Sequence, residues 1–522
     1  MDRPAWNVLT GTLTRYALLF VNVALGIFLM PFTMGHLGKA EYGLWMLAAS
    51  MTAYLQLLDL GYGNGLVRQL TQADARGDED DMNVVLSTFV VVYALIGIAA
   101  LAALVPLTGL LLPRFPNLSP EQVRTGQWVL LILGLRVAVA FPMSVFGAVN
   151  TARQRFAVTG TISIVVALAQ ATATVLVLQA GYGLIPLVAA TTTIGLTSYI
   201  AYAIVARRTF PAMRLSVRRF SRPQVREVTS YSLYLFLISI AIHLGASLDT
   251  LIIGAYLGTS AIAVYTVAVR LAEYQRQLCG QFSGFLFPLV VRFDARRDLE
   301  ALRATLLDGT RIALGLVVGV TICLVTFGAD LVTLWMGPGF ASSIAPLGVL
   351  ALAGVLMVAQ GPAGTILLST GSHRLVAGLS LLELAGNALL SVALVSRFGL
   401  LGVALGTAIP YVLLNAAVLM PRACRAVGVP LGQFIRTVAR PAALAAVPAT
   451  AVAAALRAGT SPQSLLAVVG LGAVVGAVYV VAFVGFGLPA TDRARYLGSM
   501  RRPGIGWEAR ELRRHDAQRT AM

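Results

Sequence analysis

Charged side chains are scarce in this chain. Asp, Glu, Lys and Arg together make up 12% of its 522 residues, about half of the roughly 25% found in soluble proteins. Apolar residues reach 58%, and the mean hydropathy is +0.81. A soluble protein of this length needs far more polar surface to cover itself. The composition therefore excludes a soluble multidomain enzyme and indicates a membrane protein.

Cysteine and phosphate-loop motifs give no sign of cofactor chemistry. The three cysteines, Cys279, Cys323 and Cys424, have spacings that fit neither a disulfide framework nor a metal site. The chain also lacks the GxxxxGK[ST] phosphate loop, so it does not hydrolyse ATP by that route. We expect no cofactor, no metal and no catalytic residue.

Lysine is almost absent as well: Lys39 stands alone, and arginine carries nearly all of the positive charge. The net charge of +17 would suit nucleic acid, but the arginines are scattered among the ends of apolar runs. No basic patch interleaved with aromatic residues is present. Anionic membrane lipids account for this pattern, so we expect no nucleic-acid partner.

Long apolar runs dominate the sequence. About 20 residues are enough to cross a bilayer as a helix, whereas barrel strands would be about 10 residues long with strict alternation. The runs predict an all-α polytopic membrane protein with about 14 transmembrane helices. They lie at 12–33, 42–63, 83–107, 127–149, 158–180, 183–206, 229–256, 260–290, 311–331, 344–369, 375–396, 400–420, 440–458 and 464–487.

The two halves of the chain echo each other. Pro142 and Pro362 each stand in an apolar stretch that is followed by a short basic loop, and they are 220 residues apart. The same offset relates Leu37-Gly38 to Leu257-Gly258. The echo predicts two pseudo-symmetric six-helix lobes, with a site between them and with the two prolines as hinge or turn positions. The last two spans have no counterpart and are interpreted as an appended pair.

Arginine placement predicts the orientation of these spans. The arginine-rich loops follow even-numbered spans, and the positive-inside rule puts them, and both termini, in the cytoplasm. The basic linker between the sixth and seventh spans, residues 207–228, allows two interpretations: it forms an interfacial helix over 216–226, or it is a tether. The expected parts are an N-terminal lobe (1–206), a basic cytoplasmic linker (207–228), a C-terminal lobe (229–425), the appended spans (426–488) and a basic cytoplasmic tail (489–522).

Basic residues inside spans are candidates for substrate binding, because a charge at mid-membrane is costly and usually faces a cavity. A guanidinium binds phosphate in a bidentate fork. The alternatives are an ion pair between Arg270 and Glu273 that locks helices, and an Arg15 that snorkels to the interface. The candidates for a cationic cavity are Arg15, Asn22, Arg136, Arg270 and Arg276.

Acidic residues inside spans are candidates for coupling to a proton or a sodium ion. They are Asp249, Glu273 and Glu383. Asp249 could instead act as a cap or pair with an arginine. We interpret Asp59 as a cap for a cytoplasmic turn and His243 as a packing residue.

Several short motifs are spread along the chain. They are LLDLGYGNGLVR at 57–68, LGKAEYGLW at 37–45, YLGTSAIAVY at 256–265, LSTGSHR at 368–374 and GLLGVA at 399–404. Together, in order and spacing, they resemble the polysaccharide-transport (oligosaccharide flippase) members of the multidrug/oligosaccharidyl-lipid/polysaccharide exporter superfamily. The resemblance covers roughly residues 10–440.

The resemblance implies two lobes in a V, alternating access and a cationic cavity for a pyrophosphate-sugar head group. It implies a flippase for an undecaprenyl-diphosphate-linked oligosaccharide in the bacterial inner membrane, serving O-antigen, capsule or exopolysaccharide synthesis. A proton or sodium ion would drive the cycle. A glycan polymerase and chain-length machinery are the implied protein partners.

Other functions remain open at this point. A lipid II flippase would also have fourteen spans, whereas a multidrug cation antiporter would have an acidic cavity and usually twelve. A membrane polymerase, ligase or glycosyltransferase needs a sizeable outer loop with catalytic groups. The longest outer loop, about 108–126, carries only Arg114, Glu121 and Arg124 as charges, so we expect no enzyme.

Overall fold

The computed structural model describes residues 3–487. Side chains are described from residue 13 on, except for part of those within 227–246 and 281–288. The expected basic tail at 489–522 lies outside the described residues, as does the side chain of His243.

The described part of the chain is helical throughout and contains no strand. Its α-helices are α1 (Arg3–Leu55), α2 (Tyr62–Arg76), α3 (Glu79–Pro106), α4 (Pro120–Ala152), α5 (Phe156–Gln179), α6 (Leu184–Thr209), α7 (Arg222–Tyr256), α8 (Thr259–Ala295), α9 (Leu299–Met336), α10 (Ile344–Ala359), α11 (Gly361–Ser369), α12 (His373–Leu414), α13 (Met420–Ala426), α14 (Leu431–Phe434), α15 (Arg440–Gly459) and α16 (Leu465–Ala482). The all-α fold class is confirmed.

Each predicted span coincides with helical structure. Among the residues whose side chains are described, ten helical stretches are long and apolar enough to cross a membrane. The longest helices, α1 and α12, each contain one predicted span and most of the next. They bend where Gly38 (φ 77°) and Gly399 (φ 55°) adopt backbone angles that only glycine takes readily. The total of fourteen spans stays a prediction.

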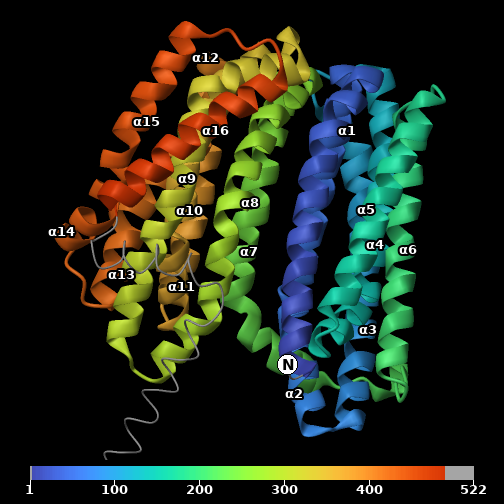
Figure 1. The fold of residues 1–522 in the computed structure, drawn as a ribbon. Helices are drawn as coiled ribbons and strands as arrows, with labels where there is room; N and C mark the ends of the chain where they lie inside the picture. The colour runs from blue at the N-terminus through green and yellow to red at the C-terminus, as the bar shows by residue number, and fades with distance from the viewer. Residues whose placement is uncertain (1–2, 488–522) are drawn as a thin grey trace, which may run out of the picture. The chain divides into compact units, whose positions relative to one another are not determined.

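The chain forms two compact units. The first contains the residues up to Tyr274, together with Val332–Ala353 and Thr370–Leu419. Within it, α1 packs on α5, α3 and α6 pack on α4, and α7 packs on α12. Figure 1 shows α1, α4, α5 and α6 side by side, with the short α2 near one end of α1.

The second unit contains Gln275–Leu331, Gly354–Ser369 and the described residues from Met420 on, including the appended pair. Its core is a close contact between α9 and α16. The rings of Tyr479 and Phe483 lie against Gly319 and Gly315, where a methyl group would approach ring carbons at 2.9 and 2.6 Å. The two glycines thus leave room on α9 for aromatic rings from α16 and from the π-helical turn Phe483–Gly487 that follows it.

Each of the two echoed prolines packs against a glycine of another helix. Pro142 lies within α4 and cannot donate to the carbonyl of Ala138 four residues earlier. Gly97 of α3 lies against that carbonyl, so close that a methyl group there would be 2.6 Å from the oxygen. In the second unit, Gly309 of α9 contacts the ring of Pro362 in the first turn of α11. The two contacts differ, one being made mainly to a backbone carbonyl and the other to the proline ring, and the pseudo-symmetry of the two halves stays a prediction.

We predict that Gly97→Ala destabilises the protein. The added methyl group must displace α3 from α4, and such overpacking costs about 1–3 kcal/mol. The control is Gly147→Ala on α4, where no atom lies within 4 Å of the new methyl group. Thermal unfolding in detergent should show a lower Tm for Gly97→Ala alone. Equal Tm values for the two variants would contradict the contact.

Candidate functional site

The predicted second span is broken partway along its length. Helix α1 ends at Leu55, a 3₁₀ turn follows over Gln56–Asp59, and α2 begins at Tyr62. Leu60 (φ 50°) and Gly61 (φ 76°) between them have left-handed backbone angles, which are uncommon for leucine. Non-helical backbone at membrane depth is tolerated where it is buried in protein or lines a water-filled cavity.

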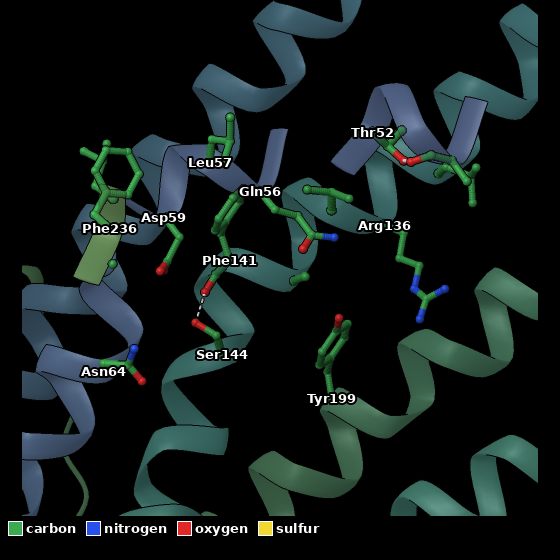
Figure 2. A pocket seen from close by; sticks show the side chains of 16 residues that line it. Thr52, Gln56, Leu57, Asp59, Asn64, Arg136, Phe141, Ser144, Tyr199 and Phe236 are labelled. Carbon is green, nitrogen blue, oxygen red and sulfur yellow. Dashed lines mark hydrogen bonds between the residues drawn. The ribbon is translucent and has the colours of Figure 1, made fainter. Parts of the chain in front are cut away.

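A cavity of about 610 Å³ lies at this break, entirely within the first unit. This volume falls in the range of roughly 300–1,000 Å³ typical of small-molecule sites. The lining residues come from α1, α2, α4, α6, α7 and the break, and Figure 2 shows their side chains. They are Ala49, Thr52, Gln56, Leu57, Asp59, Leu60, Gly61, Asn64, Leu133, Arg136, Val137, Ala140, Phe141, Ser144, Tyr199 and Phe236.

Asp59 supplies the carboxylate of this cavity. The hydroxyl of Tyr93 donates to its Oδ1 at 2.8 Å, while the backbone N–H of Gly63 is 3.4 Å from Oδ2. Tyr93 is itself fully buried and its ring stacks on Phe141. Sequence reasoning interpreted Asp59 as a cap for a turn. The structure retains only a long capping contact and places the carboxylate in the cavity wall.

Arg136 is the one predicted cationic residue that lines the cavity, and it does so from α4. Its guanidinium lies against Gly195 of α6, where a methyl group would be 3.3 Å from Cζ. The amide of Gln170, which donates to the Thr191 carbonyl at 2.8 Å, lies against the same glycine. Within the described part of the chain Arg136 has no ion pair or hydrogen bond. Its charge is therefore available to an anionic ligand.

The remaining polar groups of the cavity suit a hydroxylated ligand. In the described structure the side chains of Gln56, Asn64 and Tyr199 have no hydrogen-bond partner. Amides and hydroxyls both donate and accept. In the view of Figure 2, Asp59 and Arg136 lie on opposite sides, with Phe141 and Tyr199 between them. The cavity thus combines one cation, one anion, neutral polar groups and aromatic faces.

A second polar cluster in the same unit surrounds Asp249 of α7. Its Oδ2 accepts hydrogen bonds from the hydroxyls of Thr407 (2.8 Å) and Tyr265 (3.0 Å). Its Oδ1 is buried and has no hydrogen-bond partner among the described residues. The carboxylate therefore keeps one oxygen free to bind a cation or a proton.

Neutral oxygen atoms extend this cluster along α12. Asn387 donates from Nδ2 to the Thr407 hydroxyl at 3.1 Å and accepts from the Ser391 hydroxyl at 3.0 Å. The carbonyl of Val403 lies 3.3 Å from both the Ser391 and Thr407 hydroxyls. Sequence reasoning identified Asp249 but missed these partners, because the bend at Gly399 is what brings the two parts of α12 together.

The other acidic candidates have protein partners. Glu273 forms an ion pair with Arg270 at 2.8 Å, the partner considered as an alternative from the sequence, but both residues lie on α8, so the pair does not lock two helices together. Glu383 accepts a 2.6 Å hydrogen bond from Asn415, a buried residue in the π-helical segment Asn415–Leu419.

Three of the remaining cationic-cavity candidates lie away from the described cavity. Arg15 and Asn22 are exposed on α1, and Arg270 is half-exposed on α8. Arg276 belongs to the second unit. Conversely, sequence reasoning did not assign Gln56, Asn64 or Tyr199 to the site, because their shared cavity depends on the break in the second span.

An all-helical membrane protein with a polar cavity among its spans has the architecture of a transporter. A family model described as polysaccharide biosynthesis protein matches residues 36–345, more than half of the chain. The chain therefore belongs to this family, within the polysaccharide-transport members of the multidrug/oligosaccharidyl-lipid/polysaccharide exporter superfamily. Its homologues are transporters rather than enzymes, and it is a multi-pass membrane protein.

Individual relatives are consistent with this assignment. The uncharacterized membrane protein EpsK of Bacillus subtilis is 26% identical, over 78% of this chain and 80% of its own length. The probable low-salt glycan biosynthesis flippase Agl15 of Haloferax volcanii is 22% identical, over 38% of this chain and 42% of its own. The structure of the lipid II flippase MurJ matches with a TM-score of 0.71 at 12% identity, covering 93% of this chain and 99% of that one. At this identity the match to MurJ shows the fold alone.

We predict that Gly195→Ala impairs transport through Arg136. The added methyl group would be 3.0 Å from Gln170 Nε2 and 3.3 Å from the guanidinium, so both side chains must shift. Transport activity should fall about threefold to tenfold. This corresponds to a loss of about 1 kcal/mol in the stabilisation that a correctly oriented guanidinium gives to the transport step.

A double-mutant cycle tests this prediction. In an Arg136→Gln background, Gly195→Ala should cost little more. If the double variant loses as much activity as the two single variants combined, Gly195 acts independently of Arg136.

Proposed function

We propose that the protein is a flippase that moves an undecaprenyl-diphosphate-linked oligosaccharide repeat unit from the cytoplasmic to the outer leaflet of a bacterial inner membrane. The product would feed O-antigen, capsule or exopolysaccharide synthesis. The observation that carries the proposal is the polar cavity at the broken second span, with the unpaired guanidinium of Arg136 in its wall. Family membership and the flippase name of the archaeal relative support it.

The chemistry of the cavity matches the polar head of such a lipid. Arg136 suits a diphosphate or an acidic sugar, because guanidinium groups bind these anions through paired hydrogen bonds. Asp59, Gln56 and Asn64 suit sugar hydroxyls, and the aromatic ring of Tyr199 offers an apolar face to a sugar ring. The polyprenyl tail would stay in the bilayer throughout.

The other residues predicted for the cationic cavity belong to the same proposal at other stages of transport. Arg15, Asn22, Arg270 and Arg276 would guide or neutralise the head group as it crosses. We propose alternating access, with both termini in the cytoplasm and with Pro142 and Pro362 as hinge positions. Assembly with a glycan polymerase and its chain-length machinery is a further part of the proposal.

We also propose that Asp249 couples the cycle to a cation, either a proton or sodium. Hard cations prefer oxygen ligands, and the Asp249 cluster offers carboxylate, hydroxyl, amide and carbonyl oxygens. A single buried carboxylate suits a monovalent ion, because one negative charge then balances one positive charge. Glu273 is a weaker candidate because the guanidinium of Arg270 already balances its charge. Glu383, which Asn415 contacts through one oxygen, is the second candidate.

Arg136→Gln is expected to reduce export of surface glycan at least tenfold at normal protein level, because the head group loses its charged partner. The measurement is surface-glycan staining together with extraction of lipid-linked oligosaccharide from the cells, which should accumulate inside. Arg155→Gln, in the loop before α5, is the matched control and should export normally. The double variant Arg270→Ala/Arg276→Ala tests the second set of arginines in the same assay.

Unchanged glycan export in Arg136→Gln would contradict the assigned role of the cavity. A deletion strain tests the function itself. If repeat units reach the periplasm there but stay unpolymerised, the protein is a polymerase and the flippase proposal is wrong.

Asp249→Asn is expected to remove the dependence of transport on an ion gradient, since the amide cannot bind a cation by charge. The measurement uses proteoliposomes in which a sodium or a proton gradient is imposed in turn. At least a tenfold loss of gradient-stimulated transport is predicted, with Glu273→Gln as the control that retains the response. Full stimulation in Asp249→Asn would exclude this residue as the coupling site.

A further inference from the structure

The segment between α6 and α7, residues 210–221, crosses the start of α3 as an extended strap. Asn83 of α3 holds it with two hydrogen bonds, from Nδ2 to the Ala212 carbonyl (3.0 Å) and from the Arg214 N–H to Oδ1 (2.6 Å). Ser87 accepts from the Ser216 N–H at 3.1 Å, and Thr88 accepts from the Ser221 N–H at 3.0 Å. The strap contains one 3₁₀ turn (Val217–Arg219), and α7 begins at Arg222. It is therefore a tether without a separate interfacial helix.

The three side chains that hold the strap form a buried polar ladder on one face of α3. Asn83, Ser87 and Thr88 are spaced i, i+4 and i+5, and each is at most 3% exposed. Buried polar groups of this kind must be hydrogen-bonded, and here their partners are strap backbone groups. The ladder thus fixes the path of the strap and, with it, the direction of its side chains.

Ion pairs close both ends of the strap. Arg153 donates to the carbonyl of Thr209 and pairs with Asp74 at 3.0 Å, with its guanidinium 4.8 Å from the centre of the Phe210 ring. Near the other end, Arg219 pairs with Asp80 at 3.3 Å.

The acidic start of α3 is occupied as well. Asp81 accepts from Arg76 at 2.6 Å and from Gln224 at 3.2 Å. Asp80 pairs with Arg219, as described above. Both carboxylates at the start of α3 therefore have partners other than Arg214, Arg218 and Arg222.

The outer side of the strap is basic and apolar at once. Arg214 and Arg218 of the strap, and Arg222 at the start of α7 directly after it, are exposed and have no acidic partner within the described part of the chain. Between them stand three apolar side chains that also face outward: Leu215 (37% exposed), Val217 (74%) and Phe220 (40%). Exposed apolar groups in a basic segment at the ends of two spans are typical of a surface that rests on lipid.

We propose that the strap is a docking surface for the headgroups of anionic phospholipids in the cytoplasmic leaflet. Its arginines would bind lipid phosphates, and its apolar side chains would enter the headgroup–acyl boundary. Guanidinium groups near an anionic leaflet each add to membrane affinity. A soluble phosphate could use the arginines but would leave the apolar groups in water. This inference goes beyond the proposed function, because it assigns a partner to a surface that the transport cycle does not use.

The test uses the full chain with Val217→Cys, which carries an environment-sensitive fluorophore at the centre of the strap. The native Cys279 and Cys424 are buried, and unsubstituted protein corrects for labelling of the half-buried Cys323. The labelled protein is reconstituted into vesicles of phosphatidylcholine with phosphatidylglycerol, of which one or the other lipid is brominated. Quenching reports which lipid lies against the strap.

We expect brominated phosphatidylglycerol to quench at least fivefold more effectively than brominated phosphatidylcholine, about the contribution of one basic residue. The preference should vanish in Arg214→Gln/Arg218→Gln/Arg222→Gln. It should persist in the matched control Arg296→Gln/Arg297→Gln/Arg436→Gln, which removes the same charge from exposed positions in the second unit. Asn83→Ala/Ser87→Ala, which keeps every charge but releases the strap, should weaken the preference.

Three outcomes would overturn the lipid-docking proposal, and a fourth would overturn the role of the ladder. Equal quenching by the two lipids in the otherwise unsubstituted protein would show that the strap has no lipid preference. Equal loss in the matched control would reduce the effect to overall charge. Full displacement by millimolar inorganic phosphate would show a phosphate site in water instead. An unchanged preference in Asn83→Ala/Ser87→Ala would overturn the claim that the ladder presents the arginines.

Discussion

The requirement that backbone hydrogen bonds be satisfied inside a bilayer governs the whole arrangement. Each N–H and C=O left unpaired in hydrocarbon costs several kcal/mol, so nearly the entire described chain is helix. The second span departs from this rule at Gln56–Gly61, where it opens into a polar cavity. The break creates the proposed head-group site, because it places Asp59 and Asn64 in the wall of the cavity that Arg136 also lines. A straight helix would have aimed these side chains in different directions.

Most of the fold could be predicted from the sequence, because hydropathy reports directly on the solvent that surrounds a span. Helical structure is found at every predicted span, and glycines mark the bends in the two longest helices at Gly38 and Gly399. The linker allowed two interpretations, and the structure shows the tether. Its path depends on Asn83 and Ser87 of α3, and one sequence does not reveal a pairing between such distant polar residues.

The site was less accessible to sequence reasoning. The cost of burying charge selected Arg136 and Asp249 as polar positions within spans, and the structure shows the surroundings of both. The same argument also selected Arg270 and Glu273, which pair with each other. Hydropathy cannot separate a charge that faces a cavity from one that faces a partner. Neutral contributors such as Gln56, Tyr199 and Thr407 carry no such cost, so nothing in the sequence set them apart.

The most direct test of this account asks whether the lipid-linked head group enters the cavity at the broken span. Ser144→Cys places a thiol in the cavity wall with little change in volume. Its modification by a charged methanethiosulfonate would be followed in proteoliposomes with and without substrate. We predict that diphosphate-linked oligosaccharide slows modification and that undecaprenol alone does not. Unchanged modification during active transport of the glycan would show that the head group crosses elsewhere and would contradict the account.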